Sequence, residues 1–380
     1  MNGPIATAAS RSPDPTQVAA ELSTALGECQ AVFVFHAIDY NAQALAEAIR
    51  DAFPRACTMG CSSYGEIGPR GMTQGGVSAF GIRAGVRCAA RVLSPEHTFN
   101  QGAAVIEDMA QELGTTTAGL SLERHLMVML ADGRSLSEER TVAALAFAAP
   151  AIHLVGGSAS NNELVGTGGE EDFTRVFLNG QVHDGAHLVV LLELEIPFQV
   201  LHVHHFLPTE RRVVITRADP ARRRVVELDG WPAGQVIEEL YELPPESAKD
   251  RARFTSNPIQ LAYIVDDALF IRSVLWEEGE ELVMAGAVDE GAVLRKVRGE
   301  ALVERTRAGI ARALEAFPGE PSGMLLFNCV NRLMEATRQS EVDALFDAMA
   351  QTPVAGFHTY GEQLDRLHIN NTLTGVIFGE

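Results

Sequence analysis

Two copies of one polar motif, Gly-x-x-(Ser/Thr)-Tyr-Gly-Glu, carry the side chains of this sequence that are best suited to hold a ligand. One copy runs from Gly60 to Glu66 and the other from Gly356 to Glu362. They lie near opposite ends of the chain, too far apart for a tandem solenoid repeat. Each copy follows a short apolar stretch that is typical of a strand. The pair therefore predicts two related lobes, each with a strand that ends in a polar, glycine-hinged loop.

The side chains of these loops offer hydroxyl, ring and carboxylate chemistry. Our candidate ligand-binding residues here are Ser62, Ser63, Tyr64, Glu66, Tyr360 and Glu362. Serine hydroxyls bind polar ligand atoms, each tyrosine offers a ring face and one hydrogen bond, and each glutamate can hold a cation or an amino group. The same side chains can instead bond to their own backbone and only fix the loop. The sequence leaves both interpretations open.

A third polar loop, Gly156 to Asn162, follows the apolar stretch 152–155. Its adjacent glycines and small polar side chains favour contact with a ligand, so Ser158 and Asn161 join the candidate set. The loop has neither the Walker spacing nor the dinucleotide fingerprint, and it therefore gives no reason to expect a nucleotide.

Histidine and cysteine side chains supply the remaining candidates. Four histidines near the loops are either axial ligands for haem iron or ordinary hydrogen-bonded histidines: His36, His183, His358 and His368. The sequence has no C-x-x-C-H motif, which excludes covalent c-type haem. Cys61 is a candidate nucleophile, but no G-x-S-x-G, H-E-x-x-H or kinase motif accompanies it, so a small buried residue is the alternative.

Charge and composition exclude several classes of protein. The chain has 380 residues and a formal net charge of −20, which opposes binding to nucleic acid or to an anionic membrane surface. The basic run Arg222-Arg223-Arg224 is expected to be a solvated linker. No stretch approaches the roughly 18 apolar residues of a membrane span. Five cysteines without a disulfide pattern point to the reducing cytoplasm.

Strand and helix patterns alternate along the chain, which predicts an α/β fold in the broad sense, a mixed α+β protein whose mixed sheets are flanked by helices. Residues 1–27 are expected to form a flexible tail and a leading helix, residues 28–219 a first domain and residues 220–380 a second. In the first domain we expect strands at 31–36 and 126–130 and helices at 41–53 and 137–148. In the second we expect a helix at 298–317 and strands at 323–327 and 373–378.

The order of these motifs resembles the FIST family, bacterial sensory proteins built from a FIST N region and a FIST C region. In the first half the resemblance rests on Gly60 to Glu66, Gly157-Ser158-Ala159 and the stretch from Asp184 to Val190. In the second half it rests on Asn257-Pro258, Phe327-Asn328-Cys329 with Arg332, Gly356 to Glu362, and His368-Ile369-Asn370-Asn371-Thr372. The last pattern has one inserted residue, and Asn331 stands where the family has glycine. The resemblance makes residues 28–219 FIST N-like and residues 220–380 FIST C-like.

The resemblance implies a cytoplasmic, non-enzymatic sensor of a small ligand, amino acids having been proposed for the family. It also implies signalling in trans to a partner such as a histidine kinase or a cyclic-dinucleotide enzyme, and it adds Arg332 to the candidate ligand-binding residues. Some members are haem proteins that sense nitric oxide, so a nitric oxide sensor with haem b is one alternative. A hydrolase or lyase that uses the loop of Cys61 and Glu66 is another. The ligand, the partner and the oligomeric state are left open.

Overall fold

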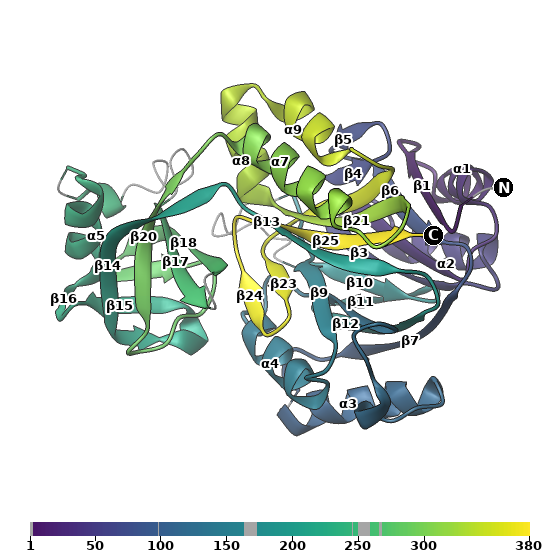
Figure 1. The fold of residues 1–380 in the computed structure, drawn as a ribbon, viewed down its shortest axis with the longest axis horizontal. Helices are drawn as coiled ribbons and strands as arrows, with labels where there is room; N and C mark the ends of the chain where they lie inside the picture. Colours follow the sequence, from purple (N-terminus) through teal and green to yellow (C-terminus); the bar gives the residue numbers. More distant parts are fainter. Residues whose placement is uncertain (1–2, 98, 163–172, 245, 250–258, 266–267) are drawn as a thin grey trace.

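One succession of elements occurs three times in this protein: strand, helix, strand, helix, strand, two-strand hairpin and strand, with two consecutive helices at the second helical position of the third copy (Figure 1). The structure is a computed structural model that describes residues 3–97, 99–162, 173–244, 246–249, 259–265 and 268–380. We call the three successions units 1, 2 and 3. The sequence motifs revealed two of them.

The units have the following bounds. Unit 1 consists of β1 (Ile5–Ser10), α1 (Pro15–Leu26), β2 (Ala31–Ala37), α2 (Ala42–Ala52), β3 (Cys57–Ser63), β4 (Glu66–Gly68), β5 (Gly71–Thr73) and β6 (Val77–Ile82). Unit 2 consists of β7 (Val86–Leu93), α3 (Phe99–Glu112), β8 (His125–Ala131), α4 (Glu138–Ala148), β9 (His153–Ser158), β10 (Arg175–Leu178), β11 (Gln181–Asp184) and β12 (His187–Leu194). Unit 3 consists of β13 (Phe198–Val203), α7 (Leu302–Glu315), β21 (Pro321–Cys329), α8 (Val330–Gln339), α9 (Val342–Met349), β22 (Val354–Thr359), β23 (Glu362–Leu364), β24 (Leu367–Ile369) and β25 (Leu373–Gly379).

Each unit contributes its hairpin to the sheet of another unit. The strand orders of the three six-stranded sheets, in the described part of the chain, are β1-β6-β2-β3-β10-β11, β7-β12-β8-β9-β23-β24 and β13-β25-β21-β22-β4-β5. The hairpin of unit 2 completes the sheet of unit 1, that of unit 3 completes unit 2, and that of unit 1 completes unit 3. The exchange is cyclic, so the three units form a pseudo-threefold arrangement.

One glycine position marks the repeat. Gly60, Gly156 and Gly356 each face the carbonyl oxygen of the residue paired with them in the parallel neighbouring strand, and a Cβ would lie 1.8, 1.9 and 1.9 Å from that oxygen. Any larger residue would force these strands apart. The units differ in the fourth to sixth residues after this glycine. Unit 2 has Ser160-Asn161-Asn162 there, whereas the other two units have Tyr-Gly-Glu.

Hydrophobic clusters fill the space between the sheets and beneath the helices. The inner faces of the three sheets share a central core, where Phe35 stacks on Phe357 with ring centroids 4.7 Å apart and Phe327 meets both rings edge-on. Their outer faces are covered by α1 and α2, by α3 and α4, and by α7 and α9, which lie on three sides of the molecule (Figure 1). This burial is the main driving force for assembling the units.

A small barrel is inserted into unit 3 between β13 and α7 (Figure 1). Its elements are β14 (Phe206–Asp219), β15 (Arg224–Leu228), β16 (Trp231–Pro232), α5 (Ala233–Tyr241), β17 (Ile259–Val265), β18 (Ala268–Glu278), β19 (Glu281–Met284) and β20 (Val293–Gly299). The strand order is β14-β20-β17-β18-β19-β15-β16, and an additional pairing of β14 with β15 closes the sheet. The barrel has a hydrophobic core of its own, to which α5 contributes.

The fold confirms the prediction of a mixed α+β protein with mixed sheets flanked by helices. Residues 5–10, expected within the flexible tail, instead form β1, because β1 pairs with β6 and buries Ile5, Ala6, Ala8 and Ser10 there. The helix expected at 298–317 is in part β20, for which the barrel provides strand partners that the local pattern does not reveal. The boundary expected at residue 220 falls inside the barrel. No described helix is long and apolar enough to cross a membrane.

Candidate functional site

The glutamates of the two Tyr-Gly-Glu loops are buried and bonded within their own units. Glu66 accepts hydrogen bonds from Ser63 Oγ (2.7 Å), Thr73 Oγ1 (3.1 Å) and Gly76 N (3.0 Å). Glu362 accepts hydrogen bonds from Thr359 Oγ1 (2.5 Å), Thr372 N (3.1 Å) and Thr372 Oγ1 (2.6 Å). Burial raises the pKa of each carboxyl group to about 7, although these donors oppose the shift. Each glutamate therefore holds the start of a hairpin in place.

A single serine of unit 2 joins the motif loops of the other two units. The Ser160 hydroxyl accepts a hydrogen bond from Tyr64 N (2.8 Å) and donates one to the carbonyl oxygen of His358 (2.6 Å). The Ser160 amide also donates to the carbonyl oxygen of Ser62 (3.1 Å). The three loops thus meet at one joint, with Ser160 at the position that tyrosine occupies in the other copies.

Several of the predicted ligand-binding side chains take part in such contacts between units. Tyr360 donates its hydroxyl hydrogen to Asn161 Oδ1 (2.7 Å), and Ser158 Oγ accepts a hydrogen bond from Gln363 Nε2 of unit 3 (3.0 Å). Ser62, Ser63, Ser158, Asn161 and Tyr360 are all buried. Tyr64, in contrast, is half-buried and lines a cavity. Bonding within the structure thus accounts for the polar groups of Ser62, Ser63, Ser158, Asn161 and Tyr360, while the Tyr64 side chain lies at the cavity.

Arg332 is fully buried and bonded on several sides. Its Nε donates to Asn328 Oδ1 (2.8 Å), its Nη2 donates to Thr306 Oγ1 (2.6 Å), and its Nη1 lies 3.4 Å from His205 Nδ1. Asn328 Nδ2 in turn lies 3.0 Å from Nδ1 of His358. In this structure Arg332 therefore holds the side chains of Asn328 and Thr306 in position, and it is itself buried beneath the surface.

The histidines that the sequence offers to haem iron do not fit that role in this structure. His36 Nδ1 lies 2.8 Å from the carbonyl oxygen of Ala37, and the Nε2 atoms of His36, His358 and His368 are covered by protein. His183 is half-exposed on the edge strand β11. Axial ligation needs a ring nitrogen that is open to the iron. The described residues also contain no group of three or more His, Cys, Asp or Glu side chains that could hold a metal ion.

Cys61 and Glu66 give no support to hydrolase or lyase chemistry. Cys61 lies in the central core, where burial raises the pKa of its thiol well above the usual value. A thiolate, the nucleophilic form, is therefore disfavoured. Glu66 is held by the three donors described above.

Two cavities lie where the helical layer of one unit faces the hairpin received from another. The apolar cavity, about 540 Å³, lies between α8, α9 and the β4–β5 hairpin and is lined by Tyr64, Met72, Thr73, Gln74, Leu333, Met334, Thr337, Arg338, Val342 and His358. The charged cavity, about 730 Å³, lies between α4, the β23–β24 hairpin and the barrel, and its lining includes Ser137, Glu139, Arg140, Tyr263, Arg272, Asp289, Arg366 and His368. At the third such place, between α2 and the β10–β11 hairpin, the exposed Gln43 donates a hydrogen bond to Gly180 O (2.9 Å) and accepts one from Val182 N (3.3 Å).

A buried ion cluster stands behind one wall of the charged cavity. Arg223 Nη2 lies 2.6 Å from the Glu138 carboxylate and 2.8 Å from that of Glu139. Burial opposes ionisation of Glu139, but Arg223, His368 and the Ala287 amide together lower the pKa of its carboxyl group to about 2. The expectation of a solvated linker is therefore wrong for Arg223, which is only 5% exposed because it neutralises two carboxylates of unit 2.

Arg272 is a buried guanidinium in the same cavity. The side chain is only 3% exposed, and its Nη1 donates to the carbonyl oxygen of Ile271 (3.2 Å) while its guanidinium lies 5.1 Å from the ring centre of Tyr263. Its Nε has no hydrogen-bond partner, and the residue forms no ion pair, within the described part of the chain. Burial lowers the pKa of Arg272. Because an unpaired buried charge is costly, this guanidinium is suited to receive an anion.

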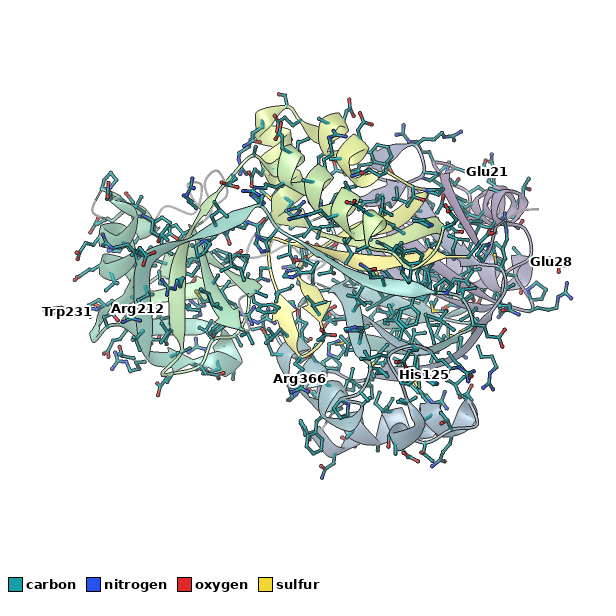
Figure 2. The ribbon with its side chains drawn as sticks, viewed as in Figure 1. Glu21, Glu28, His125, Arg212, Trp231 and Arg366 are labelled. Atoms are coloured by element: carbon teal, nitrogen blue, oxygen red, sulfur yellow. The ribbon has the colours of Figure 1, made fainter. Side chains whose placement is uncertain are left out.

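The β23–β24 hairpin and the segment after it add further unsatisfied polar atoms. Nε2 of His368 and both polar side-chain atoms of Asn370 are buried without a partner among the described residues. Arg366, at the turn of the hairpin, is exposed and lies toward the barrel (Figure 2). Asn257 and Pro258, which also carry the family resemblance, lie outside the described residues.

Sequence reasoning missed Arg272 and the Arg223 cluster. Arg272 interrupts the apolar stretch Ala268 to Trp276, and an arginine within a buried strand is the signal that could have found it, because arginine is almost never fully buried without a partner. Arg223 had no such signal. Its burial depends on Glu138 and Glu139, which are distant in sequence.

Known proteins and domains match this chain as follows. The FIST N domain matches residues 30–231 and the FIST C domain matches residues 233–365. The uncharacterized proteins Rv0628c and MT0656, from two strains of Mycobacterium tuberculosis, are each 28% identical over 169 residues, which cover 41% of this chain and 43% of the relative. The match thus spans less than half the length of these relatives.

Among solved structures, phosphoribosylformylglycinamidine synthase II from Thermotoga maritima is 10% identical, with a TM-score of 0.21 over 100% of this chain and 74% of that one. A likeness this weak carries no argument about fold or function. The two domain matches follow one another along most of the chain. FIST domains are small-ligand sensing domains of signalling proteins, and this protein belongs to the FIST family.

Proposed function

We propose that this protein is a cytoplasmic sensor that binds a small carboxylate ligand in the charged cavity. The observation that carries the proposal is Arg272, a buried guanidinium that lines the cavity without an ion-pair partner among the described residues. A carboxylate there would accept charge-assisted hydrogen bonds from the guanidinium. Glu139 and Asp289 line the same cavity and offer acceptors for an amino group, so amino acids fall within this class.

The location of the cavity supports a signalling role. Tyr263 and Arg272 come from the barrel, while α4 and the β23–β24 hairpin form the opposite side. A ligand that contacts both sides stabilises the arrangement of barrel and core that it fits best, in proportion to its difference in affinity between arrangements. A partner such as a histidine kinase or a cyclic-dinucleotide enzyme would read this change in trans.

Thermal unfolding with a panel of amino acids, and with matched amines that lack the carboxylate, tests the ligand class. We expect at least one amino acid, but not its amine, to stabilise the protein, by about 2.7 kcal/mol at a concentration 100 times its Kd. Arg272→Met should abolish the effect. Arg212→Met, on the exposed surface of the barrel (Figure 2), should leave it unchanged. Equal stabilisation by amine and amino acid, or stabilisation that persists in R272M, would refute the assignment of the cavity.

The signalling half of the proposal has its own test. The autophosphorylation rate of a candidate partner kinase is measured with the sensor, with and without the stabilising amino acid. We expect the ligand to change the rate with the original protein and not with R272M. A rate that responds equally with both proteins would show that the signal does not start at Arg272.

A further inference from the structure

The apolar cavity has the features of a second ligand site that differs in chemistry from the first. Met72 from the unit 1 hairpin and Leu333, Met334 and Val342 from α8 and α9 form its apolar lining. Its volume, about 540 Å³, is in the range of small-molecule sites, which are mostly apolar with a few placed polar groups.

A fixed hydrogen-bond donor lies in the wall of this cavity. Arg332 can only donate hydrogen bonds, so the amide oxygen of Asn328 faces its Nε at 2.8 Å and the amide nitrogen faces His358 Nδ1 at 3.0 Å. The His358 Nδ1 is therefore the acceptor, and the ring proton is on Nε2. Burial and the nearby Arg332 charge lower the pKa of His358 to about 3, which keeps the imidazole neutral.

The proton on His358 Nε2 has no acceptor among the described residues. This atom is buried and has no hydrogen-bond partner in the part of the chain that the structure describes. His358 nonetheless lines the cavity, so a small acceptor that enters it reaches Nε2 after a local shift of the covering atoms, whereas the wide ring of a haem does not fit there. A buried donor without an acceptor costs about 1–3 kcal/mol, which an acceptor on a ligand would offset.

We propose that the apolar cavity binds a neutral small molecule with an apolar body and one carbonyl or hydroxyl oxygen, which accepts a hydrogen bond from His358 Nε2. Arg332 and Asn328 act as positioning residues for this histidine. Two family motifs thus contribute to this site. The second Tyr-Gly-Glu loop supplies His358 to the cavity lining, and the motif around Phe327 holds that histidine in position. The proposal does not depend on the charged cavity.

Acetophenone and ethylbenzene are a matched pair of probes, since they are similar in size and only the first has an acceptor oxygen. Binding is followed by NMR of protein labelled at the methionine methyl groups. We expect acetophenone to shift the Met72 and Met334 signals and to bind about 5- to 10-fold more tightly than ethylbenzene. Unmoved Met72 and Met334 signals with both probes, or equal affinity for the two, would overturn the proposal.

Two substitutions distinguish the contribution of the His358 donor to binding from the contribution of the cavity itself. His358→Phe should remove the preference for acetophenone and retain binding of both probes. Met334→Trp, on a half-buried position of α8, should fill the cavity and abolish the Met72 shift even where H358F does not fold. R272M should leave both affinities unchanged, so this site can fail or succeed independently of the amino-acid site. A preference for acetophenone that persists in H358F would assign the donor to another group and refute the role of His358.

Discussion

The charged and apolar cavities occupy corresponding places in the pseudo-threefold arrangement, yet they present different chemistry. Each lies between the helices of one unit and the hairpin of another, but Arg272 of the barrel enters one and the neutral His358 lies in the wall of the other. At the third place, the exposed Gln43 bonds directly to the incoming hairpin. The repeated fold therefore places the two cavities at corresponding positions, and individual side chains decide which ligand each cavity suits.

Both cavities are bounded by a hairpin that starts at a buried glutamate. Glu66 is the first residue of the hairpin at the apolar cavity, and Glu362 is the first residue of the hairpin at the charged cavity. The two glutamates have the same raised pKa, about 7, and similar hydroxyl and amide donors. The cavities thus share their structural anchor and differ in their lining.

The largest expected effect comes from Arg223, whose ion cluster stands behind one wall of the charged cavity. Arg223→Met leaves the buried Glu138 and the partly exposed Glu139 without their cation, so we expect the free energy of unfolding to fall by about 3–5 kcal/mol in urea titrations. The control is Arg224→Met, which breaks a pair with the half-exposed Glu278 and should cost less than about 1 kcal/mol. Similar losses in the two variants would mean that the cluster does not hold barrel and core together.

The repeat also shows what the sequence can and cannot reveal. The apolar strand predicted at 126–130 and the helix at 137–148 correspond to β8 and α4, because each buries a face whose period is visible locally. Unit 2 escaped recognition because Ser160-Asn161-Asn162 replaces Tyr-Gly-Glu, while the glycine it shares with the other units is set by a backbone contact.

The site was harder to predict than the fold. Tyr64 and His358 were singled out from their loops, and both line the apolar cavity. Arg272 was not, because its importance lies in its burial without an ion-pair partner among the described residues, which no local pattern encodes. Closure of the barrel likewise depends on the pairing of β14 with β15 and on contacts that join distant strands.

The second prediction compares the two glutamate anchors through pH. In the folded state the pKa of Glu66 and of Glu362 is about 7, above the value near 4.3 of an unfolded chain, so folding is favoured by protonation. Each contribution is fully present below pH 4.3 and is lost as the pH rises through 7, by an amount on the order of 3 kcal/mol. Glu66→Gln and Glu362→Gln should each remove one contribution and flatten the fall in stability between pH 5 and 8 (roughly the window set by the two pKa values).

Urea titrations at several pH values measure this effect. If the anchors are equivalent, the two variants change the slope equally, and the double variant changes it by the sum. A normal slope in E66Q with a reduced one in E362Q would show that only the hairpin of the charged cavity is held by a protonated carboxyl group. In that case the two cavities would differ in their glutamate anchors as well as in their linings.

The smallest expected effect concerns Ser160, where unit 2 joins the two loops beside the apolar cavity. Ser160→Ala leaves Tyr64 N without its acceptor and the His358 carbonyl oxygen without its donor, so we expect a loss of about 1–2 kcal/mol in the free energy of unfolding. Ser23→Ala, on the partly buried surface of α1, is the control and should change stability by less than about 0.5 kcal/mol. Because Tyr64 and His358 line the apolar cavity, S160A should also weaken acetophenone binding there, while amino-acid stabilisation through Arg272 stays unchanged. An equal loss of binding at both sites would mean that the joint couples the two cavities, which would replace the picture of independent sites with one of a linked pair.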